Sequence, residues 1–186
     1  MRGDVVKFKK QRNVPFVLPS ISFILYPPTF TEKTMTLKIG DQAPEFSLLS
    51  DQHQTISLSG FRGKKIILYF YPKDNTPGCT REACNFRDTL KSFRDKNTEI
   101  IGVSKDNPEK HQKFKQKYLL PFALLSDEKG DVCEAYGVIN KKSLFGRSFL
   151  GIERSTFLID EEGRIRAIWR KVKVNGHSQQ VLNELN

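Results

Sequence analysis

Apolar residues follow two different periods along the chain from residue 35 onward. Residues 65–71, KIILYFY, form a nearly continuous apolar run, which predicts a strand buried on both faces of a sheet and ended by Pro72. Shorter β-rich runs predict further strands at residues 46–49, 55–58, 98–103, 122–125, 155–159 and 164–169. The last two runs are separated by a polar turn, DEEG, and should pair as an antiparallel hairpin.

A helix is expected soon after the central strand. Thr76 suits the N-cap of this helix and Pro77 suits its first position. Apolar residues then recur at spacings of four and three, which places the following on one helical stripe: Cys79, Ala83, Phe86, Leu90 and Phe93. Further helices are expected from Asn107-Pro108 onward, over residues 127–136 and over residues 177–185.

The order of these elements determines the expected fold class. Strands and helices alternate through the first half of the domain, which favours parallel neighbours in one sheet. The closing hairpin adds antiparallel strands, and a last helix follows. The sequence therefore predicts an α/β protein with a central mixed β-sheet flanked by helices, in a thioredoxin-like arrangement.

Residues 1–34 differ in texture from the rest of the chain. A basic stretch at residues 7–12 precedes an apolar run at residues 14–26, which is too short to span a membrane and contains Pro15 and Pro19. The run loosely resembles a signal peptide, but no small-x-small cleavage site follows it. We expect residues 1–34 to be a dispensable extension or a misplaced start, with a targeting segment as the alternative. Residues 35–186 form the expected domain.

Composition narrows the function classes. Hydrophobic residues make up 38% of the chain and charged residues 28%, which is typical of a globular domain rather than a disordered one. The net charge is +10, yet basic residues after Met35 are mostly interleaved with acids, and no nucleic-acid motif is visible. We therefore expect no nucleic-acid binding. Three cysteines make a poor disulfide framework for a secreted protein and favour a reducing compartment.

Cys79 is the strongest candidate for chemistry. It is expected in the first turn of a helix, where unpaired N–H groups and a partial positive charge favour a nucleophilic thiolate. Pro77 and Gly78 restrict the loop and let the backbone approach a small ligand closely. These features indicate an activated nucleophile. The position on the apolar stripe also fits a small buried hydrophobic residue, so this second interpretation stays open.

Residues 70–84, FYPKDNTPGCTREAC, resemble the active-site signature of the peroxiredoxins. Cys84 lies five residues after Cys79, a spacing similar to that of the peroxiredoxin Q group, also called bacterioferritin comigratory protein. The segments IGDQAPEFSL near residue 39, GVSKD at 102–106 and GIERSTFLID at 151–160 match as well. The resemblance covers about residues 36–185.

This resemblance implies roles for individual residues. Cys79 corresponds to the peroxidatic cysteine, which becomes a sulfenic acid, and Cys84 to the resolving cysteine, which forms a disulfide with Cys79. Thr76 corresponds to the threonine whose hydroxyl contacts the peroxide. Arg154 corresponds to the arginine beside the sulfur. Pro72 corresponds to the proline that shields the thiolate.

The resemblance also implies the reaction and its partners. We expect an atypical two-cysteine peroxiredoxin that reduces hydrogen peroxide and organic hydroperoxides to water and alcohols, with Pro72 and Gly78 lining the substrate pocket. Thioredoxin, or a glutaredoxin in some members, would reduce the disulfide. No metal or organic cofactor is expected, and neither is membrane association. We expect a cytoplasmic antioxidant monomer, unless residues 1–34 direct it to an organelle or out of the cell.

Two other function classes are alternatives to the peroxidase. A disulfide oxidoreductase on the same fold requires Cys-x-x-Cys, but the position three after Cys79 holds Glu82. A non-enzymatic module would bind partners through its basic face. Cys133 is expected to be a packing residue, and the three histidines lack metal-ligand spacing. Lys141, Lys142 and Arg147 are expected in a basic loop.

Overall fold

The computed structural model describes residues 36–144 and 147–185. The extension or targeting segment expected at residues 1–34 lies outside these described residues and stays a prediction. The boundaries of the domain expected over residues 35–186 stay a prediction as well.

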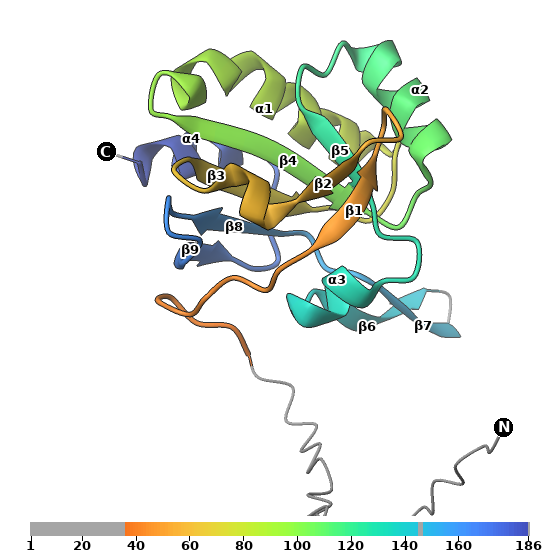
Figure 1. The fold of residues 1–186 in the computed structure, drawn as a ribbon. Coiled ribbons are helices and arrows are strands. Elements are labelled where there is room, and N and C mark those ends of the chain that lie inside the picture. The colour runs from red at the N-terminus through yellow and green to blue at the C-terminus, as the bar shows by residue number, and fades with distance from the viewer. Residues whose placement is uncertain (1–35, 145–146, 186) are drawn as a thin grey trace, which may run out of the picture. The chain divides into compact units, whose positions relative to one another are not determined.

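A seven-stranded mixed sheet forms the centre of the domain, in the order β2-β1-β5-β4-β3-β8-β9 (Figure 1). Its strands are β1 (Ser47–Ser50), β2 (Thr55–Ser57), β3 (Lys65–Phe70), β4 (Thr98–Ser104), β5 (Ala123–Ser126), β8 (Ser155–Ile159) and β9 (Ile165–Trp169). The strands β3, β4 and β5 run parallel, and the β8–β9 hairpin is antiparallel. The expected mixed sheet is therefore confirmed, including the pairing of the closing hairpin.

Helices cover both faces of this sheet. They are α1 (Pro77–Arg94), α2 (Pro108–Tyr118), α3 (Asp131–Ala135) and α4 (His177–Asn183), with a short 3-10 helix η1 (Leu58–Phe61). One apolar cluster joins Ile67 and Tyr69 of β3 to residues of α1, α2 and α4, and the other joins Ile66 and Leu68 to Tyr136 beside α3. In Figure 1, α1 and α2 lie on one side of the sheet and α3 lies on the other. Alternate residues of β3 thus pack into opposite halves of the core.

Local signals in the sequence explain most element boundaries. The five residues of the apolar stripe of α1 are all buried, as the spacing predicted. Asn107 caps α2 by accepting a hydrogen bond from the N–H of Lys110 at 3.0 Å. Thr76 is the N-cap of α1 by backbone conformation, but its hydroxyl does not cap the helix. It donates instead to the carbonyl of Lys73 at 3.0 Å.

Residues 139–152 were wrongly expected to hold a basic loop. They form a two-stranded antiparallel ribbon of β6 (Ile139–Leu144) and β7 (Arg147–Ile152), so Lys141, Lys142 and Arg147 all lie in strands. The ribbon was missed because its strands mix polar and basic residues with apolar ones and show no regular alternation. The helix expected from residue 127 begins instead at Asp131, because Asp127 turns inward and accepts from the N–H of Cys133.

Sheet register brings distant residues to one edge. The N–H of Tyr71 continues the β3–β4 ladder by donating to the carbonyl of Val103 at 3.1 Å. Phe70, at the end of β3, pairs with Ser155, at the start of β8. Arg154 therefore arrives beside the carboxyl end of β3, where α1 begins. In open α/β sheets, ligands bind at this edge.

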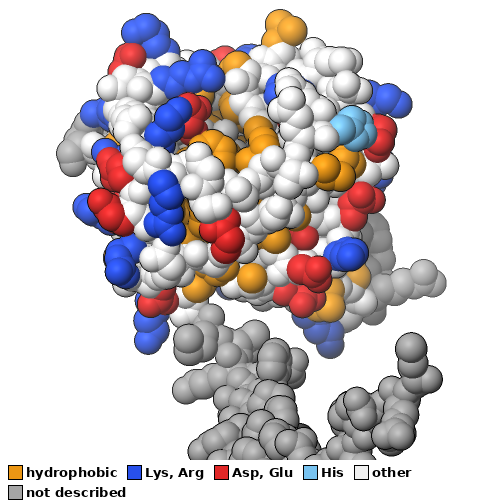
Figure 2. Space-filling view, viewed as in Figure 1, with side chains coloured by type: hydrophobic (Ala, Val, Ile, Leu, Met, Phe, Trp, Pro, Cys, Tyr) orange, Lys and Arg blue, Asp and Glu red, His pale blue; other side chains and the backbone are white. Residues whose placement is uncertain are grey.

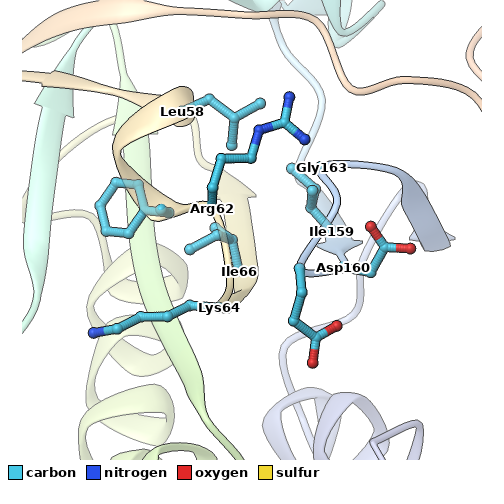
Figure 3. A pocket seen from close by; sticks show the side chains of 9 residues that line it. Leu58, Arg62, Lys64, Ile66, Ile159, Asp160 and Gly163 are labelled. Carbon is cyan, nitrogen blue, oxygen red and sulfur yellow. The ribbon is translucent and has the colours of Figure 1, made fainter.

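A small cavity lies at the opposite end of β3. It lies where Ile66, near the start of β3, faces Ile159, at the end of β8, and Arg62, Asp160 and Gly163 line it as well (Figure 3). Its volume is about 10 Å³, room for about one water molecule. The carboxylate of Asp160 is already bound by the N–H groups of Glu162 and Arg164. At this end of the sheet, the carboxylate of Asp160 therefore closes the turn between β8 and β9.

The surface mixes charges of both signs. On the face that Figure 2 shows, basic and acidic side chains are interspersed, with apolar side chains between them. No helix within residues 36–144 and 147–185 is long and apolar enough to cross a membrane.

Candidate active site

The amino terminus of α1 presents Cys79 in its first turn. Pro77 occupies the first helical position, and the first hydrogen bond of the helix runs from the N–H of Thr80 to the carbonyl of Thr76 at 2.9 Å. The N–H groups of Gly78 and Cys79 lie ahead of this bond, where a helix has no internal acceptor for them. They carry the partial positive charge of the helix end. The side chain of Cys79 is buried.

Arg154 places a guanidinium directly on the sulfur. Its Nη2 lies 3.2 Å from Sγ of Cys79, and its Nη1 donates to the carboxylate of Glu82. Burial lowers the pKa of Arg154, but Glu82 and Cys79 outweigh burial and raise the pKa above its ordinary value. The guanidinium therefore stays charged beside the sulfur, and a fixed positive charge favours the thiolate.

Glu82 is a site residue that the sequence analysis did not find. It is buried one turn along α1 from Cys79, and burial raises its pKa to about 7, although the charge and hydrogen bond of Arg154 pull it down. Its Oε1 has no hydrogen-bond partner among the described residues. A spacing of three from Cys79 places both side chains on the same helical face, and this was the signal available in the sequence.

The loop of residues 71–76, here called the catalytic loop, joins β3 to α1. It contains two of the expected site residues: Pro72, expected in the substrate pocket, is exposed, and Thr76, expected to contact the peroxide, is half-buried at the start of the helix. A Cβ added to Gly78 would lie 3.4 Å from Nη2 of Arg154, so the glycine backbone packs against the guanidinium. The structure thus brings Thr76, Gly78, Cys79 and Arg154 to one edge of the sheet.

The other two cysteines differ in exposure. Cys84 is half-buried on α1, in the same continuous helix as Cys79, and no disulfide is formed among the described residues. Cys133 is fully buried, and desolvation together with Asp127 raises the pKa of its thiol far above the ordinary value. Cys133 therefore stays a protonated thiol at neutral pH and has the environment of a packing residue.

Known proteins resemble the chain over most of its length. The model of the AhpC/TSA family matches residues 39–168. The chain belongs to this family. The putative peroxiredoxin bcp of Coxiella burnetii is 54% identical over 151 residues, which are 81% of this chain and 100% of that protein. Peroxiredoxin Bcp of Bacillus subtilis is also 54% identical over 151 residues, 81% of this chain and 96% of that one.

Solved structures place the chain in the same branch of the AhpC/TSA family. The bacterioferritin comigratory protein of Xanthomonas campestris matches with a TM-score of 0.75 and 39% identity, over 80% of this chain and 95% of that one. A cysteine-to-serine mutant of PrxQ from Xylella fastidiosa matches with a TM-score of 0.76, at 39% identity and the same coverage. The chain is therefore a peroxiredoxin of the peroxiredoxin Q group with a thioredoxin-like fold, as its signature suggested.

Proposed function

We propose that this peroxiredoxin reduces peroxides with Cys79 as the attacking residue and Cys84 as the resolving one. The observation that carries the proposal is the Arg154 guanidinium, 3.2 Å from a sulfur at a helix amino terminus. A fixed charge and two N–H groups that have no acceptor within the helix favour the thiolate, and the same donors can hold a peroxide oxygen. A related protein supports the substrate class, since the bacterioferritin comigratory protein of Xanthomonas campestris has alkyl peroxide reduction activity.

The first chemical step transfers one oxygen atom to Cys79. The thiolate attacks one peroxide oxygen, the O–O bond breaks, and the other oxygen leaves as water or an alcohol after taking up a proton. Arg154 and the same N–H groups stabilise the charge that develops on the leaving oxygen. The Thr76 hydroxyl donates to the Lys73 carbonyl, so its lone pairs stay available to accept a hydrogen bond from the peroxide.

The second step forms a disulfide and releases water. The Cys84 thiolate attacks the sulfenic sulfur of Cys79, and the hydroxyl leaves with one proton. Both cysteines lie in the unbroken helix α1, five residues apart. Five residues rise about 7.5 Å along a helix, whereas a disulfide closes only when the two Cα atoms lie within about 7 Å. The first turns of α1, about residues 78–88, must therefore unwind before this bond forms.

A dithiol then exchanges with the disulfide and returns both cysteines to thiols. We propose thioredoxin as this reductant, with a glutaredoxin as the alternative, because the peroxiredoxin Q signature of the chain implies a protein dithiol. The monomeric state and the cytoplasmic location also stay predictions.

Replacement of each cysteine tests these assignments. In an assay that couples thioredoxin and its reductase to peroxide consumption, Cys79→Ser is expected to abolish turnover. Cys84→Ser should still consume one peroxide per chain but fail to turn over, because no disulfide forms. Cys133→Ser is the matched control, a third cysteine in the same domain, and it should turn over at the wild-type rate. Loss of activity in the control alone would refute the assignment.

A further inference from the structure

A buried polar network lies beneath the catalytic loop, and no step of the reaction above uses it. Its centre is Asp74, which is 6% exposed although it lies in a loop. The Tyr71 hydroxyl donates to Oδ1 of Asp74 at 2.7 Å. The Nδ1 of His111 lies 2.8 Å from Oδ2, and the N–H of Asp74 donates to Oδ2 of Asp106 at 2.8 Å. Backbone and side chain of one loop residue are thus held from three directions.

The partners of Asp74 are themselves fixed to the fold. Nε2 of His111, on α2, lies 3.2 Å from the carbonyl of Leu125, an acceptor, so this nitrogen carries a hydrogen. The N–H of Asp106 donates to Ser104 Oγ at 3.1 Å, at the end of β4. The Ser126 hydroxyl, at the end of β5, donates to the Asp106 carbonyl at 2.6 Å. The position of the catalytic loop is therefore fixed relative to the ends of β4 and β5 and to α2.

The protons on Tyr71 and between His111 and Asp74 are compatible with this set of hydrogen bonds. Burial, followed by the nearby Tyr69 and Asp74, raises the pKa of Tyr71 well above its ordinary value, so the phenol remains a hydrogen-bond donor. The contact between His111 and Asp74 needs one proton between two acceptor-capable atoms, whichever of them holds it. All three contacts to Asp74 can therefore be satisfied together.

The network contributes little to the stability of the fold. A buried pair of ionisable groups contributes little net stability compared with apolar residues of similar size, because both groups lose their hydration. What such a pair supplies is a defined position, since its hydrogen bonds tolerate little displacement. The position fixed here is that of the Lys73–Asp74 segment, whose Lys73 carbonyl orients the Thr76 hydroxyl.

We propose that Asp74 is a positioning residue for the oxidation of Cys79. Held by Tyr71, His111 and Asp106, it sets the place of the catalytic loop, and through the loop the direction of the Thr76 hydroxyl and the start of α1. It does not touch the sulfur in the described contacts and acts only through the loop. This inference rests on the proposed function, because it concerns the first step of that reaction.

The test measures the second-order rate constant of Cys79 with hydrogen peroxide. All variants are made in the full chain carrying Cys84→Ser, which isolates the first step, and the rate is read by competition with a haem peroxidase. Asp74→Ala should lower the rate constant about 100-fold, the loss that a misplacement of about 1 Å causes. Asp74→Asn should restore it to within about fivefold, because an amide can accept from Tyr71 and donate to His111.

Asp51 provides a matched control for loss of stability. It is also a buried carboxylate that contacts α2 and β5, through Lys115 Nζ at 2.8 Å and the N–H of Leu124 at 2.9 Å, but it lies beside β1. Asp51→Ala should lower the melting temperature as Asp74→Ala does and leave the rate constant unchanged. An unchanged rate in Asp74→Ala, or an equal loss in Asp51→Ala, would overturn the inference.

A milder variant covers the case in which Asp74→Ala does not fold. Tyr71→Phe removes one hydroxyl and no carbon, and we expect the rate constant to fall about tenfold, as for a lost hydrogen bond of about 1.4 kcal/mol. A wild-type rate in Tyr71→Phe would then overturn the inference. If the chain without these variants fails to react at Cys79, the proposed function is wrong and this inference is wrong with it.

Discussion

The two segments that flank Cys79 are held in the fold by different kinds of contact. Before Cys79, the catalytic loop is tied down through Asp74, which is buried and bonded by Tyr71, His111 and Asp106. After Cys79, α1 is tied down through Glu82, which pairs with Arg154, and through longer contacts nearer the surface: Arg81 donates to Asn175 at 3.3 Å, and Asn85 donates to the Val174 carbonyl at 3.5 Å. The cysteine stands at the boundary between a fixed segment and one that is easier to release.

Apolar packing along α1 shows the same gradient. The first two turns bury the small side chains of Cys79 and Ala83 and the carboxyl of Glu82. Large apolar side chains begin at Phe86 and continue with Leu90 and Phe93. Buried apolar area stabilises at about 25 cal/mol per Å², so the later turns hold the helix far more strongly than the first two. Unwinding should therefore start at Pro77 and weaken beyond Phe86.

Hydrogen exchange in the reduced and oxidised forms gives the sharpest test of this comparison. In the oxidised form, amides of residues 80–88 are expected to lose protection, most strongly before Phe86, because the Cys79–Cys84 bond cannot form on an intact helix. The N–H groups of Tyr71 and Asp74 should stay protected in both forms. Equal protection of residues 80–88 in the two forms, with the disulfide verified by mass spectrometry, would contradict the model of local unwinding.

Arg154, like the catalytic loop, is held by the sheet. It directly precedes β8, and its carbonyl accepts a hydrogen bond from the N–H of Val172 at 3.0 Å. Arg154→Lys should lower the rate of Cys79 oxidation by about 10²- to 10³-fold. Lysine keeps the charge but cannot bind the sulfur and Glu82 with one planar fork. Arg164→Lys, an exposed arginine at the far end of the sheet, is the control and should react normally. A near wild-type rate in Arg154→Lys would remove the arginine from the mechanism.

Glu82, in the first turns of α1, should make the stability of the protein depend on pH. Burial raises its pKa from 4.5 to about 7, so between these values the folded protein holds a proton that the unfolded chain does not. Stability should therefore fall as pH rises through this window, by at most about 1.4 kcal/mol per pH unit. Denaturant unfolding of the reduced protein from pH 4.5 to 7.5 measures this slope. In Glu82→Gln the slope should be smaller; the same slope in both proteins would contradict the assignment.

The sequence predicted those parts of the fold and site that depend on neighbouring residues. The buried run of β3, the stripe of α1 and the cap of α2 are local patterns, and each is confirmed in the structure. The approach of Arg154 to Cys79 came from the resemblance, because 75 residues separate them and only the β3–β8 register brings them together.

The features that the sequence did not predict depend on tertiary contacts. Asp74 reads as an ordinary loop acid, and His111 as one of three scattered histidines, until α2 packs against the loop and pairs them. The β6–β7 ribbon lacks the apolar alternation that identifies a strand. In the sequence, Glu82 stands out only as the residue that breaks a Cys-x-x-Cys pattern, although its helical spacing of three from Cys79 places both on one face.

The fixed catalytic loop has a consequence for the speed of the cycle. In the proposed cycle, reduction lets α1 rewind from a start held by the catalytic loop, with Arg154 and Thr76 still around it. Closing a segment of about ten residues takes about 10–100 ns, and forming a short helix about 0.1–1 μs. Association rate constants between proteins are about 10⁵–10⁷ M⁻¹s⁻¹. At micromolar concentration of the reductant, its encounter with the oxidised protein is therefore much slower than either of these steps. Turnover at saturating peroxide should therefore rise in proportion to reductant concentration, with the refolding of the helix adding no measurable delay.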